Sequence, residues 1–123
     1  MACKILVVDD ERELQHLILQ RFWSEIQQGQ YEFAFAYDGE EAMAILKNDT
    51  AVAIVVTDLN MPRMDGLTFI KTALNRGLTC QFVILTAFSD PENRQQGLNL
   101  GVRNFLTKPI DFGLLKKTIE TIV

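Results

Sequence analysis

The sequence predicts an α/β fold: a doubly wound, five-stranded parallel sheet with strand order 2-1-3-4-5 and five helices. Short uninterrupted runs of Val, Ile and Leu are typical of strands that are buried on both faces of a parallel sheet. The stretches between these runs are long enough for helices, so that strand and helix alternate along the chain. With 123 residues, the chain can bury one core but not two, so we expect a single domain spanning residues 1–123.

The first half of the chain begins with a strand at residues 5–8. A helix of about four turns should follow, because apolar side chains recur at helical spacing. These side chains are Leu14, Leu17, Ile18, Phe22 and Ile26. Residues 31–36 alternate large and small side chains, which indicates a second strand. A second helix follows Asp38-Gly39, with inward side chains Ala42, Ile45 and Leu46.

In the second half, residues 53–57, 82–85 and 105–107 are the expected strands. Each remaining helix follows an aspartate placed to cap it: Asp65, Asp90 and Asp111. The inward side chains of the third helix should be Leu67, Ile70, Ala73 and Leu74.

The strand order follows from the apolar patterns. The alternating strand at residues 31–36 belongs at an edge of the sheet, and the continuous runs belong in its centre. Right-handed crossovers in the order 2-1-3-4-5 meet both conditions. This order places the first and third strands side by side, at the point where the chain reverses direction across the sheet and a crevice opens.

Polar side chains stand where four of the five strands end: Asp9-Asp10, Asp58, Thr86-Ala87 and Lys108. The carboxyl ends of parallel strands share one edge of the sheet, so we expect these residues to converge in one pocket. Crowded carboxylates repel one another, and a hard divalent cation removes that conflict. Oxygen ligands favour Mg²⁺ (or Mn²⁺) over Zn²⁺. We therefore expect a metal site at this edge.

A phosphoryl group can be handled beside such a metal. Asp58 stands alone at a strand end and is the expected nucleophile, whereas the pair Asp9-Asp10 is better suited to holding the metal. Lys108 would neutralise the charge that develops on the transferred group. The Thr86 hydroxyl could bond a phosphoryl oxygen, and the small Ala87 allows the backbone to approach closely.

These residues resemble the response regulator receiver domain of two-component signalling, a flavodoxin-like fold that includes chemotaxis regulators. The matching motifs are Asp9-Asp10, Asp58-x-Asn60-Met61-Pro62-x-Met64-Asp65-Gly66, Thr86-Ala87 and Phe105-x-x-Lys108-Pro109. The resemblance implies an aspartyl phosphate at Asp58, formed from a histidine kinase or a histidine phosphotransfer protein. It implies Mg²⁺ held by Asp10, Asp58 and the Asn60 carbonyl, with Asp9 acting through water, and a cis bond before Pro109. Such a protein is a signalling switch that catalyses only its own phosphorylation and slow dephosphorylation.

The resemblance also implies how the signal leaves the site. Thr86 is expected to move toward the phosphoryl group, and Phe105 to rotate into the space that it leaves. The affected surface would be the face of the fourth helix, fifth strand and fifth helix, where it would bind an output domain, a partner protein or a second copy. Exposed contact residues there would be Arg94, Arg103 and Lys116. Phe88 is expected at the mouth of the site, where it would slow attack by water.

Three alternatives use related folds or chemistry. A haloacid-dehalogenase-type phosphatase carries a second Asp two positions after its nucleophile as general acid, but Asn60 occupies that position here. A flavodoxin-like carrier needs a Ser/Thr/Gly-rich loop after the first strand, where this chain has two carboxylates. A degenerate receiver would lack part of the acidic set or Lys108.

Charge and hydropathy exclude other classes of partner. A net charge of −4 and a pI near 4.9 leave no basic stripe for nucleic acid. The apolar runs are too short to cross a bilayer, so we expect a cytoplasmic protein without a membrane partner.

Overall fold

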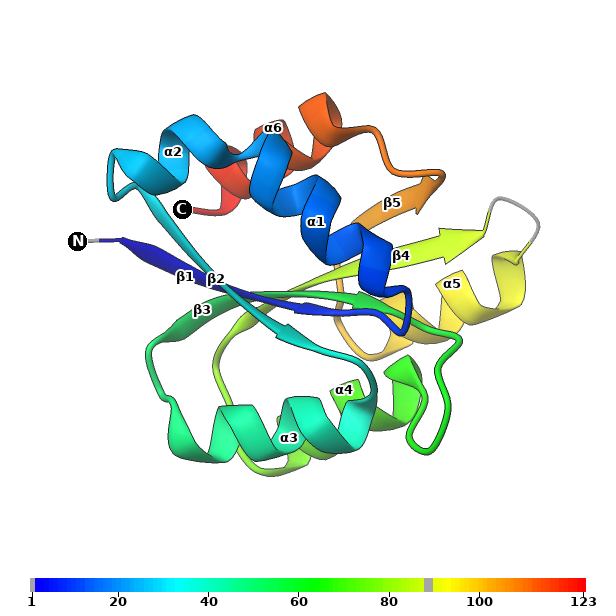
Figure 1. Cartoon of the computed structure of the whole chain (residues 1–123). Helices are drawn as coiled ribbons and strands as arrows, with labels where there is room; N and C mark the ends of the chain where they lie inside the picture. The colour runs from blue at the N-terminus through cyan, green and yellow to red at the C-terminus, as the bar shows by residue number, and fades with distance from the viewer. Residues whose placement is uncertain (1, 88–89) are drawn as a thin grey trace.

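The computed structural model describes residues 2–87 and 90–123 as a single parallel sheet between two layers of helices (Figure 1). The strands are β1 (Cys3–Val8), β2 (Tyr31–Ala36), β3 (Val52–Asp58), β4 (Gln81–Ala87) and β5 (Asn104–Lys108). All four neighbouring pairs are parallel, and the strand order is β2-β1-β3-β4-β5. The predicted fold class and strand order are therefore confirmed.

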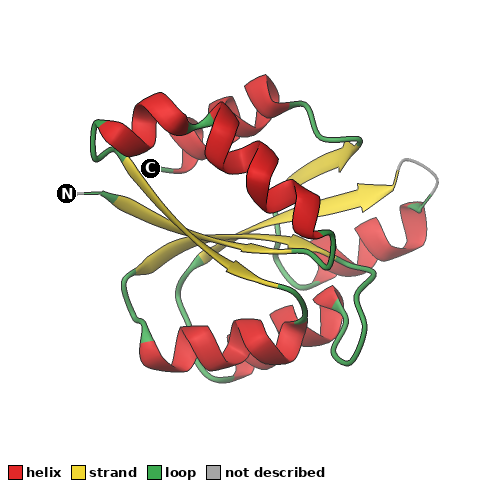
Figure 2. Ribbon diagram, in the orientation of Figure 1, coloured by secondary structure: helices red, strands yellow, loops and turns green. Residues whose placement is uncertain are grey.

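Helices cover both faces of the sheet, as Figure 2 shows. One layer contains α1 (Arg12–Arg21), α2 (Trp23–Gln27) and α6 (Phe112–Ile122). The other layer contains α3 (Gly39–Asn48), α4 (Gly66–Asn75) and α5 (Pro91–Asn99). No helix in residues 2–87 and 90–123 is both long and apolar enough to cross a membrane.

Two apolar clusters, one on each face of the sheet, explain the uninterrupted apolar runs. Within β1, Leu6 and Val8 pack toward α3 and α4, whereas Ile5 and Val7 pack toward α1 and α6. Successive side chains of a strand point to opposite faces. A strand with a core on each side must therefore be apolar at every position.

The first predicted helix is divided in two, so the described residues contain six helices rather than the predicted five. At Phe22 the backbone leaves helical geometry, with φ −104° and ψ 14°. The Phe22 ring is fully buried and lies edge-on to Tyr31 and Phe33 of the edge strand β2. Helical hydrogen bonds continue on both sides of Phe22, so the break is not caused by a missing hydrogen bond. We attribute it to the packing of the Phe22 ring.

The prediction that Leu74 is buried is wrong, because 39% of its surface is exposed. The inward side chains of α4 include Phe69, Ile70 and Ala73, and the Phe69 ring packs edge-on against Phe82. The fully buried Phe69 side chain marks the face of α4 that points toward the core. Leu74 lies five positions later and is rotated away from that direction by about 140°.

Aspartates begin the helices that they were predicted to cap. Backbone N–H groups three positions later donate to the carboxylates of Asp65, Asp90 and Asp111. Each cap satisfies a backbone donor that the first turn of the helix would otherwise leave unpaired. The caps therefore fix where these helices begin, next to the carboxyl edge of the sheet. The strand ends and the loops of the site therefore lie together at this edge.

Candidate functional site

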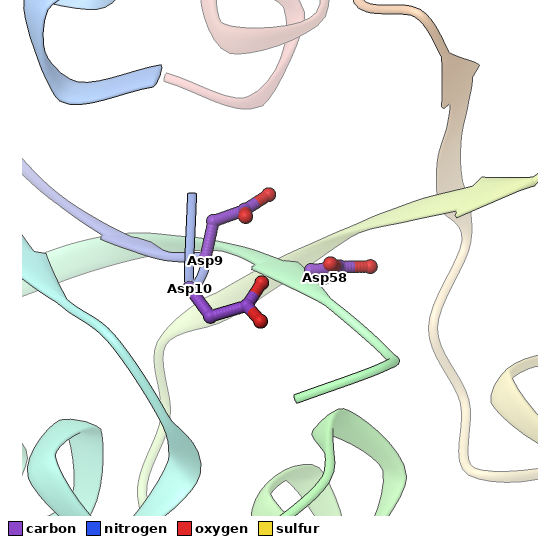
Figure 3. A group of neighbouring side chains, drawn as sticks. All are labelled: Asp9, Asp10 and Asp58. Carbon is purple, nitrogen blue, oxygen red and sulfur yellow. The ribbon is translucent and has the colours of Figure 1, made fainter. Parts of the chain in front are cut away.

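Three carboxylates gather at the carboxyl edge of the sheet (Figure 3). Asp9 and Asp10 follow β1, and Asp58 is the last residue of the neighbouring strand β3. One carboxylate oxygen from each lies within 4.8 Å of the others. Asp9 and Asp58 are buried, whereas Asp10 is exposed. The sheet thus brings Asp58 together with an acidic pair that lies 48 and 49 positions earlier in the sequence.

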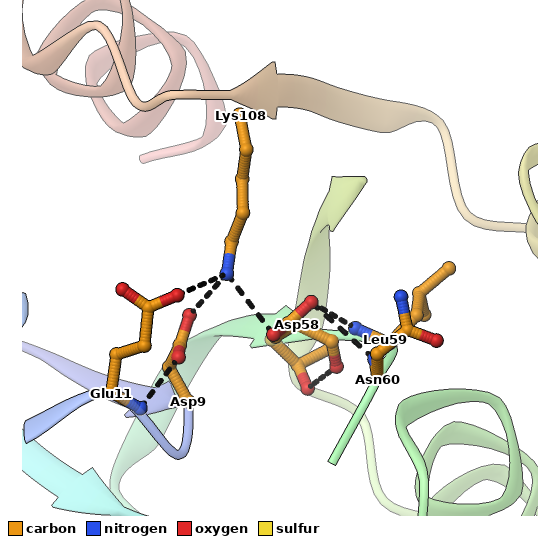
Figure 4. A network of polar contacts seen from close by, with 7 residues as sticks. Asp9, Glu11, Asp58, Leu59, Asn60 and Lys108 are labelled. Atoms are coloured by element: carbon orange, nitrogen blue, oxygen red, sulfur yellow. Dashed lines mark hydrogen bonds and ion pairs between the residues drawn. The ribbon is translucent and has the colours of Figure 1, made fainter. Parts of the chain in front are cut away.

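Lys108 from the end of β5 reaches this cluster (Figure 4). Its Nζ lies 3.0 Å from Asp9 Oδ2 and 3.0 Å from Asp58 Oδ2. Glu11 adds a carboxylate oxygen 3.7 Å from the same Nζ. A single ammonium therefore bridges the two buried carboxylates. Charge-assisted hydrogen bonds of this kind are stronger than those between neutral groups.

The Asp58 carboxylate is held at both of its oxygens. Oδ1 accepts hydrogen bonds from the backbone N–H groups of Leu59, at 2.8 Å, and Asn60, at 3.4 Å. Oδ2 accepts the bond from Lys108. Burial raises the pKa of the Asp58 carboxyl and outweighs the opposing effect of the Lys108 hydrogen bond. The ionised form of Asp58 therefore needs positive charge nearby.

Lys108 remains charged in this setting. Burial lowers the pKa of its ammonium, but hydrogen bonds to Asp9 and Asp58 outweigh burial and raise the pKa above its ordinary value. The peptide bond between Lys108 and Pro109 is cis, as the family resemblance implies.

The acidic residues fit a hard divalent cation. All the side-chain atoms that the cluster offers are carboxylate oxygens, and their mutual distances allow one ion to contact several of them. Lys108 supplies one positive charge to a group of three carboxylates and Glu11, so the cluster retains negative charge that a cation would neutralise. The donor set favours Mg²⁺ or Mn²⁺ over Zn²⁺.

Thr86 and Ala87 stand beside this cluster, at the end of β4. Thr86 follows Leu85, the register partner of Asp58, and Ala87 pairs with Lys108. The buried Thr86 hydroxyl donates a long bond of 3.4 Å to the Ala87 carbonyl. Phe105 lies further back in β5 and is half-buried. Phe88 is outside the described residues, so its expected position at the mouth stays a prediction.

Three contributors were missed from the sequence. Glu11 directly follows the acidic pair, and this adjacency could have pointed to it. Arg63 and Asp38 form an ion pair beside the site. They are 25 positions apart, and no spacing rule joins a loop residue to a helix cap at such a separation.

Comparisons with known proteins agree with this geometry. The family model of the response regulator receiver domain matches residues 5–120. The probable chemotaxis protein CheY of Rhizobium etli is 33% identical over 97% of this chain and 91% of that protein. The transcriptional regulatory protein TctD of Salmonella typhimurium is 34% identical over 98% of this chain.

A solved structure is also similar throughout. The chemotaxis protein CheY4 of Vibrio cholerae has a TM-score of 0.85 and 28% identity, with both chains fully covered. The chain spans 51% of the length of TctD and 25% of the transcriptional regulatory protein ZraR of Salmonella typhimurium, which is another relative. The family match over residues 5–120, the similarity to complete chemotaxis regulators and the site geometry lead to one conclusion. The chain belongs to the response regulator receiver domain family of two-component signalling.

Proposed function

We propose that this receiver accepts a phosphoryl group on Asp58 in a Mg²⁺-dependent reaction and so switches a binding surface. The observation that carries the proposal is the setting of Asp58. Its carboxylate bonds Lys108 at 3.0 Å and lies within 4.8 Å of oxygens of Asp9 and Asp10. This arrangement provides a nucleophile, a fixed cation and a metal-binding cluster at one point.

In the proposed reaction an oxygen of Asp58 attacks the phosphorus, and the acyl phosphate bond forms as the bond to the leaving group breaks. With a phosphohistidine donor, the leaving group is the imidazole nitrogen. The Leu59 N–H holds the carboxylate in orientation, and Lys108 neutralises negative charge on the transferred group. When bound, Mg²⁺ supplies further neutralisation of the phosphoryl oxygens. Asp10, Asp58 and the Asn60 carbonyl would hold it, with Asp9 acting through water.

We assign the phosphodonor surface to a cleft of about 520 Å³ that opens beside Lys108. Its apolar lining comes from α1, from the segment between β5 and α6 and from the first residue of α6, and includes Leu14, Leu17, Ile110 and Phe112. The acidic cluster and this lining are continuous, since Asp9 and Lys108 also border the cleft. A histidine kinase or a histidine phosphotransfer protein would dock there and present its phosphohistidine to Asp58.

The proposed switch connects Thr86 to Phe105. The 3.4 Å bond from Thr86 to the Ala87 carbonyl is long, so exchanging it for a bond to a phosphoryl oxygen costs little. The Phe105 ring lies 4.9 Å from the Arg94 guanidinium, and a Cβ at Gly97 would come within 3.0 Å of it. Rotation of Phe105 would therefore disturb α5 directly.

The output surface is the face of α5, β5 and α6, where an output domain, a partner protein or a second copy would bind. Arg94 and Arg103 are exposed, as expected of contact residues. Lys116, the third expected contact residue, is half-buried, with its Nζ 2.7 Å from Glu25 and 5.1 Å from the Phe22 ring centroid. Lys116 therefore joins α6 to α2.

Hydrogen exchange tests the switch. Activation by beryllofluoride and Mg²⁺ is expected to change amide protection in α5 and β5, because the contacts of Phe105 with Arg94 and Gly97 would be remade. The comparison is with protein in Mg²⁺ alone. Protection changes limited to the loop after Asp58, with none in residues 90–120, would refute this route.

Intact-mass spectrometry tests the phosphorylation itself. Acetyl phosphate with Mg²⁺ or Mn²⁺ is expected to add the mass of one phosphoryl group. Lys108 and the divalent cation are then both present to neutralise the charge on the transferred group. EDTA should prevent the addition, and Asp58→Asn should abolish it. Equal labelling with and without the metal would contradict the proposal.

A further inference from the structure

The loop of residues 59–65, which follows Asp58, is attached to the turn between β2 and α3. Arg63 donates to Asp38 Oδ2 from Nε, at 2.7 Å, and also from Nη2. Asp38 is only 2% exposed, and its other oxygen caps α3 by accepting from the Glu41 N–H at 2.9 Å. A buried carboxylate thus receives its counter-charge from this loop.

The two segments also meet through their backbones. The Gly39 N–H donates to the Met64 carbonyl at 3.1 Å. A Cβ at Gly39 would lie 2.7 Å from that oxygen, so the approach requires glycine. Arg63 itself has a φ of 65°, in the left-handed region that non-glycine residues rarely adopt. A glycine would adopt this φ freely. We infer that the hydrogen bonds of the Arg63 side chain to Asp38 offset the strain of its backbone.

The attached loop is also the one that presents Asn60. Its two ends are fixed near Asp58, because the Asn60 N–H donates to Asp58 Oδ1 and the Gly66 N–H donates to the Leu59 carbonyl. Its middle is fixed by Arg63 and Met64 through Asp38 and Gly39. The orientation of the backbone carbonyls between these anchors therefore depends on the anchors at both the ends and the middle.

We propose that the ion pair between Arg63 and Asp38 positions the Asn60 carbonyl for Mg²⁺. Arg63 and Asp38 are positioning residues, which act on the metal through the loop. This inference rests on the proposed function, in which Asn60 contributes a metal ligand. Contacts that orient metal ligands typically change metal affinity about 10- to 100-fold when they are removed.

Three variants separate the ion pair from other effects. Asp38→Asn keeps an oxygen that can cap α3 and removes the charge. Arg63→Gly removes the guanidinium and adopts the φ of 65° without strain. Asp49→Asn is the matched control, since Asp49 pairs with Lys4 near the amino ends of β1 and β3. Mg²⁺ affinity is measured by titration with nuclear magnetic resonance, and stability by thermal melting in EDTA.

Asp38→Asn and Arg63→Gly are each expected to weaken Mg²⁺ binding about tenfold, and the double variant no further, because both remove the same contact. Asp49→Asn should bind Mg²⁺ as the parent does. Arg63→Gly should melt close to the parent in EDTA, since relief of strain offsets the lost ion pair. Its Gly39 amide should nevertheless exchange faster. Arg63→Lys should restore part of the affinity, because it returns a positive charge beside Asp38.

Four results would overturn the inference: unchanged affinity in Asp38→Asn and Arg63→Gly, additive losses in the double variant, an equal loss in Asp49→Asn, or no recovery in Arg63→Lys. Each of these leaves the proposed function intact if the parent binds Mg²⁺. A parent that binds no Mg²⁺ would instead overturn the proposed function, and this inference with it.

Discussion

Replacing Lys108 by alanine is expected to slow the phosphorylation of Asp58 by acetyl phosphate about 100-fold, the usual loss when one fixed stabilising group is removed from a transition state. Lys108 donates to both Asp9 and Asp58 at 3.0 Å. Without it, negative charge on the transferred phosphoryl group loses a fixed cation. The rate is followed by intact mass at saturating Mg²⁺, with Lys117→Ala as the control because Lys117 is an exposed lysine of α6.

The same variant should bind Mg²⁺ about tenfold more tightly, because an ammonium beside the carboxylates no longer repels the metal. The two effects have opposite signs, so a general loss of folding cannot produce both. Unfolding in EDTA should also begin at a lower urea concentration than in the parent, since the buried carboxylates of Asp9 and Asp58 are left without their ammonium. A Lys108→Ala protein that is phosphorylated at the parent rate would contradict the role assigned to Lys108.

Replacing Gly66 by alanine is expected to destabilise the protein by about 3 kcal/mol, at the upper end of ordinary overpacking. A Cβ at Gly66 would lie 2.2 Å from the Asp58 carbonyl oxygen and 2.8 Å from the Leu59 Cα. These are backbone atoms, which cannot move aside as a flexible side chain can. The end of β3 must therefore shift, and the Asp58 carboxylate shifts with it.

Thermal melting measures this effect, and a loss of the expected size lowers the melting temperature by about 10 °C. Gly113→Ala is the matched control because it also lies in the first turn of a helix, and its Cβ would meet only Asp111 Oδ1 at 3.3 Å. That control should melt near the parent temperature. Equal melting of Gly66→Ala and the parent would show that the loop accommodates the extra carbon.

The sheet and the site could be predicted because both depend on short patterns in the sequence. Uninterrupted apolar runs identify buried parallel strands, and the residues that end those runs must share one edge. Asp9, Asp58 and Lys108 are brought together by topology alone, so knowing the strand order was sufficient. The helix caps at Asp65, Asp90 and Asp111 depend on short local patterns, so they could be predicted equally well.

The remaining features depend on contacts between segments that no local pattern joins. The helix break at Phe22 reflects packing against Tyr31 and Phe33. Lys116 pairs with Glu25, which joins the last helix to α2. The ion pair of Arg63 with Asp38 joins a loop to a buried helix cap. Each of these required the relative placement of two elements, which periodicity does not give.

The identity of the phosphorylated residue is the most direct test of the proposed switch. After reaction with acetyl phosphate and Mg²⁺, borohydride reduces an acyl phosphate to an alcohol, which converts the modified aspartate to homoserine. Peptide mass spectrometry then locates the change. We predict homoserine at position 58, and none at position 9 or 10, because the Asp58 carboxylate is the one oriented by Leu59 and paired with Lys108. Homoserine at another aspartate, or labelling that persists in Asp58→Asn, would contradict the account.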